Sequence, residues 1–449
     1  MLRKKKTEKS AKGDEVVLPP IEFKPPISDK QLQQGILIAC RAIEQYPVTV
    51  MLIAQAISAR ADQLLLDCTA QGVSVRFRVD GMWETMPPMD RPTGDGVVVI
   101  LKRLCNLNPT DRRSRQTAKL AVGLMGDWIF EFVSQGVPTG ERILIRVEPK
   151  KAILKTLSDL GMRDKMQEQL KSLLNGDDAL VMLSGPAGHG LPTTWRVAMD
   201  AADKYVRDFH SVEDININDP EIINITRHTF NQAAGETPMT VLKSLLLKQP
   251  DVMVIPDFVN IETLKVVCDQ IISQHRFAIS RIIAGSAVEG LLKLLATYKS
   301  EAKTLVKITS GVLNQRLMRR LCDQCRQAFQ PSPQLLQKLG IPPGRVAALY
   351  QPYVPPPPEQ RVDAKGNPIE IPICPKCNGR GYYGRVAVFE LLVLNDAIRK
   401  AVLQNPTPDN ILQVARQQGF LSIQEEGVLA VATGTTSLQE LQRVLAPPR

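Results

Sequence analysis

The sequence contains no uninterrupted apolar stretch of about 18 residues, so no segment is expected to cross a lipid bilayer. Its N-terminal segment, MLRKKKTEKSAKGDE, also lacks the apolar core that follows the positive charges of a secretory signal. Both absences predict a cytoplasmic location. In a reducing compartment, the eight cysteines favour metal ligands or buried thiols over disulfides. Aromatic residues make up only 5% of the chain, which leaves few side chains for stacking on nucleic-acid bases.

The length and composition allow a globular protein of several domains. The 449 residues suffice for roughly three domains of about 150 residues each. Apolar residues make up 44% and charged residues 23%, which is typical of globular chains. The net charge of +10 is compatible with a nucleic acid, an anionic membrane surface, an acidic partner or a solvated basic surface. Composition alone does not choose among these four.

The N-terminal third of the chain contains two segments of different character. Residues 1–30 form a basic, proline-bearing tail that is expected to be disordered. Residues 31–155 are expected to form an α+β domain. Helical periodicity there is followed by the alternating strand VSVRFRV, a hairpin-type turn at Asp80-Gly81 and two further strands.

The rest of the chain begins with alternating strands and helices. Residues 156–321 repeat short apolar strands and amphipathic helices, which predicts an α/β domain with a parallel sheet covered on both faces. Within that segment, residues 290–321 are expected to be helical. Two segments complete the chain: a cysteine-bounded, proline-rich insertion at 322–394 and a set of short helices at 395–449.

A glycine-rich turn follows the first strand of the α/β domain, in the sequence ALVMLSG-PAGHG-LPTTWRVAMD. Gly185 and Gly190 occupy the two glycine positions of the phosphate-binding pattern G-x-x-x-x-G-K-[ST], and Gly188 lies between them. The lysine position holds Leu191 and the hydroxyl position holds Pro192. Leucine removes the cation, and proline removes both the magnesium-binding hydroxyl and a backbone N–H. These residues alone fit a tight strand–helix connection as well as they fit a phosphate site.

Two C-x-x-C pairs predict a metal site. Each pair can place two thiolates on one ion, and two pairs complete the tetrahedral four-cysteine set that zinc prefers in structural sites. Such a closed site has no open position for catalysis. The remaining cysteines lie in apolar contexts and are expected to be core thiols. The four predicted zinc ligands are Cys322, Cys325, Cys374 and Cys377, and the four core thiols are Cys40, Cys68, Cys105 and Cys268.

Several motifs in order resemble the ATPases of type II secretion and type IV pilus assembly, over about 400 of the 449 residues. The strongest are RLMRRLCDQC and CPKCNGRGYYGRVAVFELL, which are similar to the zinc-binding module of that family. VRFRVDG, GERILIRV, SVEDI, LKSLLLKQPDVMVIPDF and GTTSLQELQRV resemble further family motifs. The resemblance implies a RecA-like P-loop NTPase core, ATP and magnesium as cofactors, and hexameric rings. It also implies inner-membrane assembly proteins as partners and a position peripheral to the inner membrane.

Several functional residues of the family are replaced in this sequence. The phosphate-binding lysine falls on Leu191 and the magnesium-binding hydroxyl on Pro192, although Thr193 and Thr194 follow. The histidine of the family falls on Ile283, and its phosphate-sensing arginine falls on Phe132. Glu213 is the best match for the catalytic carboxylate, and Asp257 keeps the charge, though not the length, of the Walker B glutamate. Other matched positions are also retained: Arg112, Arg113 and Gln116 of the N-terminal domain, Asp214 beside Glu213, and Asp251 before the Walker B strand.

Three hypotheses follow from these residues. The first is a catalytically degenerate ring subunit that serves as a scaffold or regulator of pilus assembly or protein secretion. The second is a working ATPase in which Arg196, or Arg112 and Arg113 of a neighbouring subunit, replaces the missing lysine. The third, a nucleic-acid-binding zinc protein, is disfavoured by the few aromatics, and no specific nucleic acid is expected as a partner.

Overall fold

Two compact units make up the protein, Met1–Ile153 and Leu154–Arg449, and each is described by itself. The computed structural model describes residues 18–151, 154–217, 221–357, 360–361 and 369–446. Of the predicted N-terminal tail, residues 1–17 lie outside this range, whereas Glu22–Lys24 form strand β1 and pair with β5. Phe23 of β1 is buried in the core, so this end of the predicted tail belongs to the sheet.

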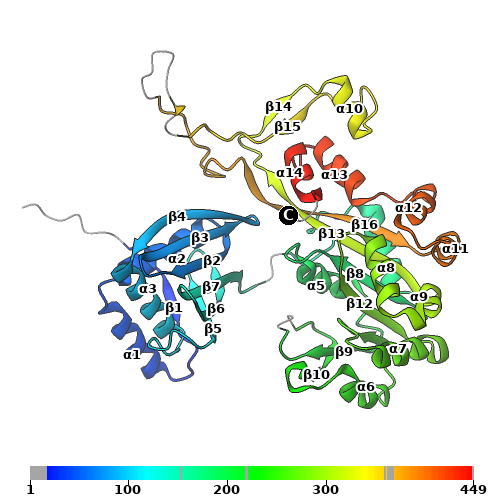
Figure 1. Ribbon diagram of the computed structural model, residues 1–449, viewed down its shortest axis with the longest axis horizontal. Coiled ribbons are helices and arrows are strands. Elements are labelled where there is room, and N and C mark those ends of the chain that lie inside the picture. Colours follow the sequence, from blue (N-terminus) through cyan, green and yellow to red (C-terminus); the bar gives the residue numbers. More distant parts are fainter. Residues whose placement is uncertain (1–17, 152–153, 218–220, 358–359, 362–368, 447–449) are drawn as a thin grey trace, which may run out of the picture. The chain divides into compact units, whose positions relative to one another are not determined.

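The first unit contains a seven-stranded antiparallel sheet in the order β1-β5-β6-β7-β2-β3-β4. Helices α2 and α3 pack on this sheet, and α1 packs on α3 (Figure 1). Its other elements are α1 (Lys30–Arg41), α2 (Tyr46–Ser58), β2 (Ala61–Cys68), β3 (Gly72–Val79), β4 (Met82–Asp90), α3 (Arg91–Leu104), β5 (Gln116–Gly123), β6 (Asp127–Val137) and β7 (Gly140–Pro149).

Strand β3 confirms the alternation that the sequence predicts. Val73, Val75, Phe77 and Val79 are buried, while the residues between them are half-exposed. Because successive side chains of a strand point to opposite faces, this pattern places one face of β3 on the core. Asp80 and Gly81 both have positive φ, at 51° and 84°, as the two central residues of a tight hairpin require.

The second unit is built on a seven-stranded sheet in the order β10-β9-β11-β12-β8-β13-β16. Its neighbouring strands are parallel except for the antiparallel pair β13 and β16. The predicted α/β fold class, with a RecA-like P-loop core, is confirmed. The strands are β8 (Leu180–Gly185), β9 (Phe209–Asp214), β10 (Ile225–Phe230), β11 (Val252–Val254), β12 (Phe277–Ile283), β13 (Thr309–Leu321) and β16 (Tyr382–Val393).

Helices cover both faces of this sheet, in keeping with its buried strands (Figure 1). One apolar core joins α4 and α5 to the sheet, around Trp195 and Leu183. A second core joins α6 to α9 to the other face, around Leu264 and Leu291. The helices are α4 (Asp164–Leu174), α5 (Leu191–Ala201), α6 (Pro238–Leu246), α7 (Ile261–Gln274), α8 (Ala287–Thr297) and α9 (Ala302–Ile308).

The prediction that residues 290–321 are helical is wrong for their second half. Helix α9 ends at Ile308, and Thr309–Leu321 form the long strand β13 between β8 and β16. Both faces of β13 are covered, so its apolar residues do not alternate with polar ones. Periodicity alone cannot distinguish such a buried strand from a helix.

The C-terminal part of this unit adds short helices and a small hairpin. Buried Glu390 of β16 accepts hydrogen bonds from the first N–H groups of α8 and α13, at Ala287 (2.5 Å) and Ile423 (2.6 Å). One carboxylate thereby ties two helix N-termini to the sheet. The elements are β14 (Gln327–Phe329), α10 (Pro333–Leu339), β15 (Leu349–Gln351), α11 (Asp396–Gln404), α12 (Pro408–Gln417), α13 (Ile423–Ala432) and α14 (Leu438–Leu445).

No single helix in the described part of the chain is long and apolar enough to cross a membrane. Helices α1 and α2 pass the test of length and composition only when taken together, and they are bent by 104° at the break between them.

Candidate functional site

The glycine-rich turn joins β8 to α5 and is seated against β13. Gly188 and Gly190 have φ values of 79° and 83°, in the left-handed region that favours glycine. A Cβ atom added to Gly190 would lie 3.0 Å from the Leu317 side chain, and one added to Gly185 would lie 3.2 Å from Gln315. These glycines therefore allow both the turn and its close approach to the neighbouring strand.

The first turn of α5 differs from a phosphate cradle in two ways. Leu191, at the lysine position, is only 5% exposed and packs into the apolar core that includes Trp195. Pro192 lacks an N–H, and the N–H groups of Thr193 and Thr194 both donate to the Gly190 carbonyl, at 3.0 and 3.2 Å. The lysine position thus faces the protein interior, and these three residues aim no free N–H at the turn.

His189 is folded inward from the turn onto β13. Its Nδ1 accepts a hydrogen bond from the Leu317 N–H at 3.1 Å, and its carbonyl accepts one from Gln315 Nε2 at 2.7 Å. Burial, followed by the nearby charges of Arg316 and Arg443, lowers the pKa of His189 below its ordinary value. The side chain therefore acts as a neutral acceptor that anchors the loop.

The two retained carboxylates lie in different environments near the carboxyl ends of neighbouring strands. Glu213, on β9, forms an ion pair with Arg227 at 2.6 Å and lines a small cavity with Trp195 and Ser211. The cavity is only about 10 Å³, close to the space that one water molecule needs. Asp257, just after β11, is exposed, and its Oδ1 accepts the N–H of Val259 at 2.9 Å. The pairing of Glu213 with Arg227 has no signal in the sequence.

Three further positions considered from the sequence carry side chains that are apolar or already bonded within the protein. Ile283, at the family's histidine position, is 51% exposed at the end of β12. Phe132, at the sensing-arginine position, is 1% exposed in the core of the first unit. Arg196, the candidate replacement for the missing lysine, donates to the Leu154 carbonyl at 2.5 Å and lies 3.7 Å from Asp200.

The four cysteines of the two C-x-x-C pairs come together after β13 and before β16. Their sulfur atoms all lie within 4.8 Å of one another, and the Cys322–Cys374 and Cys325–Cys377 distances are 3.8 and 3.5 Å. In a tetrahedron with metal–sulfur bonds of about 2.3 Å, the sulfur atoms lie about 3.8 Å apart. The donor set therefore fits a single tetrahedral ion.

Backbone N–H groups around this cluster favour thiolates. The Gly381 N–H donates to Cys377 Sγ at 3.3 Å, and Gly379 and Gly381 adopt the left-handed conformation that the knuckle requires. A hydrogen bond from the Cys377 N–H lowers the pKa of the Cys374 thiol to about 7. The other four cysteines are buried, as predicted, and burial raises the pKa of Cys105 to about 12.

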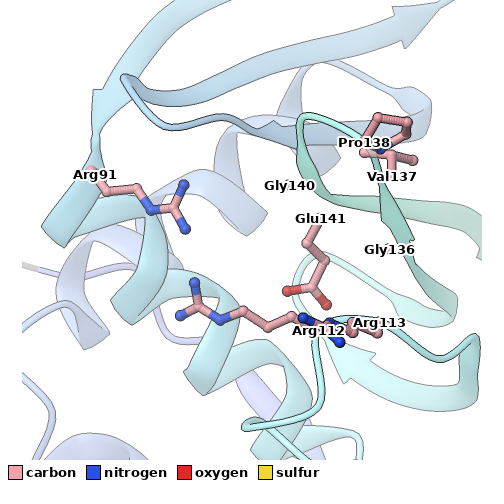
Figure 2. A pocket seen from close by; sticks show the side chains of 8 residues that line it. All are labelled: Arg91, Arg112, Arg113, Gly136, Val137, Pro138, Gly140 and Glu141. Carbon is pink, nitrogen blue, oxygen red and sulfur yellow. The ribbon is translucent and has the colours of Figure 1, made fainter.

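The first unit contains an arginine-lined cavity of about 450 Å³ (Figure 2). Arg91 and Arg112 approach the same carboxylate, that of Asp95, at 2.9 and 3.2 Å. Arg113, on the loop before β5, is exposed and has no ion-pair partner among the residues that the structure describes. The opposite wall comes from the end of β6, the start of β7 with Glu141, and the turn between these strands.

Buried residues of the first unit compensate the negative charge of Glu141. Fully buried Lys102 forms an ion pair with it, and Ser134 Oγ donates to it at 2.7 Å. The cavity thus combines three arginines with carboxylates that are already paired, so it favours an anionic ligand. Arg91 was not anticipated from the sequence, because it belongs to no recognised motif and reaches the cavity only through the packing of α3.

Comparison with known proteins identifies a single family. Residues 43–443 match the family described as "Type II/IV secretion system protein". The chain is 26% identical over 391 residues to the type IV pilus assembly ATPase PilB of Thermus thermophilus, covering 85% of this chain and 41% of that relative. It is 27% identical over 397 residues to the type II secretion system protein E of Dickeya dadantii, covering 88% of this chain and 74% of that relative.

Solved structures agree on the fold. The Legionella pneumophila ATPase DotB superposes with a TM-score of 0.56 at 10% identity, over 88% of this chain and 94% of that one. The pilus retraction motor PilT with bound ADP superposes with a TM-score of 0.53 at 15% identity, over 88% and 96%. The chain spans less than half the length of the Thermus relative and about three quarters of the Dickeya relative.

Proposed function

The chain belongs to the type II/IV secretion system protein family, and from that premise we propose that it is a catalytically degenerate ring subunit, a scaffold or regulator of pilus assembly or protein secretion. It would act in the cytoplasm, at the inner membrane, as part of a homo- or hetero-hexamer with inner-membrane assembly proteins. The observation that carries the proposal is the burial of Leu191 in the core, where a phosphate-binding lysine would have to face the nucleotide.

The chemistry of phosphoryl transfer explains why this position matters. Catalysis there depends almost entirely on positioned charge, and removing one electrostatic donor from such a site costs about 10²-fold or more in rate. Leu191 supplies no charge, and Pro192 supplies neither a magnesium-binding hydroxyl nor a backbone N–H. The hydrogen bond of Arg196 supports the same conclusion, because it holds the guanidinium group on the Leu154 carbonyl.

Any nucleotide contact that the chain retains is expected at two places. One is the turn itself, through the backbone of Gly185, Gly188 and Gly190 and the start of α5 at Leu191, Thr193 and Thr194. The other is the cavity of the first unit, through Arg112 and Arg113. Glu213 and Asp257 would be the residual catalytic carboxylates, although the Arg227 ion pair occupies the first of them.

We assign Zn²⁺ to the four-cysteine cluster. Its four thiolates would complete a tetrahedron with no open position, so the ion would hold the hairpin-bearing insertion to the end of β13 and would have no part in catalysis.

The test is calorimetric titration of the full-length protein with ATP, with and without magnesium, together with a phosphate-release assay. We expect no magnesium-dependent hydrolysis. Hydrolysis that Glu213→Ala and Asp257→Ala together abolish would overturn the proposal in favour of a working ATPase with an unorthodox site. The matched control is Leu191→Lys with Pro192→Ser, which restores the motif residues. Because Leu191 is buried, we expect this variant to lose stability without gaining activity.

A further inference from the structure

Polar pairs on both faces attach β10, the edge strand of the parallel sheet, to its neighbour β9. Arg227 and His228 are consecutive in β10, so their side chains point to opposite faces of the sheet. Arg227 Nε lies 2.6 Å from Glu213 Oε2 on the α5 side. On the other side, His228 Nε2 lies 2.8 Å from His210 Nδ1, and the two rings are nearly parallel, with 15° between their planes and centroids 5.1 Å apart.

A third residue completes a chain of hydrogen bonds. His210 Nε2 lies 2.9 Å from Oδ2 of Asp208, the residue just before β9. One arrangement of protons satisfies every contact: His210 Nε2–H donates to the Asp208 carboxylate, and His210 Nδ1 accepts from His228 Nε2–H. The side chain of His210 is only 5% exposed, so water cannot readily replace either bond.

The number of protons on the two rings decides whether these hydrogen bonds can form. One added proton fits, because His228 can carry it on Nδ1 while Nε2–H still donates to His210. A second added proton places an N–H on both facing nitrogens, which removes the acceptor and leaves two positive rings in contact. The contact is therefore compatible with at most one proton in excess of the neutral pair.

The charges around the pair oppose its full protonation. Asp208, just before β9, is the one carboxylate in contact with the pair among the described residues. Its side chain is 55% exposed, so solvent screening weakens the compensation that its negative charge provides. Lys248, just after α6, adds a positive charge near His228. The facing parts of β11 and α6 are uncharged, at Met253 and at Leu242 and Leu245. Burial, with His210 and Lys248, lowers the pKa of His228.

We propose that Asp208, His210 and His228 form a proton-sensitive latch: β10 stays on the sheet while the histidine pair carries at most one added proton, and is released when both rings are protonated. Release would also withdraw Arg227 from Glu213 and so uncover that carboxylate. The direction follows from linkage. Because the folded-state pKa of His228 is lowered, the pair resists taking up protons until the pH falls below the ordinary histidine pKa of about 6.5. The latch is therefore intact above that pH and is lost at lower pH, once the second proton is added. The latch does not depend on whether the protein hydrolyses ATP.

Hydrogen exchange of the full-length protein tests the latch directly. Amide protection factors, corrected for the intrinsic effect of pH, are compared at about pH 7.5 and about pH 5.0, on either side of the histidine range. We expect the protection of residues 225–230 to fall roughly tenfold on acidification, the factor expected for one lost hydrogen bond. Protection of the central strand β12 should stay constant.

Two variants separate the latch from general acid sensitivity. In His228→Gln, the amide can still donate to His210 Nδ1 but cannot titrate, so the protection of β10 should become independent of pH. His275→Gln is the matched control, because His275 is 76% exposed and pairs with Asp178 outside the latch, and it should keep the wild-type response. Unchanged protection of β10 in the wild type, which needs no substitution, or an equal loss in His228→Gln would overturn the proposal.

Discussion

Replacing Glu141 by alanine is expected to destabilise the first unit by about 3–5 kcal/mol, because it leaves the Lys102 ammonium group buried without a counter-ion. The side chains of Lys102 and Glu141 are 0% and 3% exposed, and they form an ion pair beneath the arginine-lined cavity. Lys102 Nζ also donates to the Asp111 carbonyl at 2.6 Å, and Ser134 Oγ donates to Glu141 at 2.7 Å. The substitution removes the carboxylate that forms the ion pair with Lys102, and Ser134 loses its acceptor as well.

This loss of stability is expected to lower the melting temperature of the first unit substantially. For a unit of this size, about 1 kcal/mol lowers the melting temperature by roughly 2–4 °C, so a drop on the order of 10 °C is expected. Urea-dependent hydrogen exchange reports each unit separately, through peptides of β2 and β7 for the first unit and of β8 and β12 for the second. Only the first set should lose protection at lower urea.

The double variant Lys102→Met, Glu141→Leu provides the control. Replacing both members of a buried ion pair with apolar residues of similar volume is often neutral or stabilising, so this variant should recover most of the loss. A loss below about 1 kcal/mol in Glu141→Ala, or an equal loss in the double variant, would refute the argument that the unpaired charge is the cause.

Two further predictions concern the second unit. Cys322→Ser should lower the zinc content, measured by mass spectrometry, from one ion per chain and make the β14–β15 hairpin sensitive to protease. Cys268→Ser, at a buried thiol outside the cluster, should leave both the zinc content and the protease resistance unchanged. His189→Asn keeps an acceptor for the Leu317 N–H but removes the titrating group. Since the folded-state pKa of His189 is lowered, its contribution to stability is present above about pH 6.5 and is lost below the shifted pKa. The variant should therefore lose less thermal stability than the wild type on acidification. An equal loss in both proteins would contradict that role.

The parts of the fold that follow local rules could be predicted from the sequence. The alternation in VSVRFRV and the Asp80-Gly81 turn identify their hairpin, because side-chain period and positive φ are local properties. The four cysteines were likewise identifiable from spacing, since each C-x-x-C pair supplies two donors to one ion.

The parts that depend on tertiary packing could not be predicted. Strand β13 was expected to be helical, because a strand covered on both faces has no alternation to reveal it. The sequence showed that the lysine was missing from the turn, but it gave no sign that Leu191 points into the core or that His189 bonds to β13. The contacts of Arg91, and the pairing of Glu213 with Arg227, join residues whose proximity is set by neighbouring strands and helices rather than by spacing along the chain.

The turn at Gly185–Pro192 is packed against the core and bonded to β13. A lysine that was simply lost would leave a polar turn open to solvent, with its N–H groups unpaired. Here Leu191 fills the core beside Trp195, and Pro192 sits in the first turn of α5, where its fixed φ suits a helix. The loop also gains two hydrogen bonds to β13 through His189. Each of these residues satisfies a packing or hydrogen-bonding need of the folded chain, and such local order is what the proposed scaffold role requires.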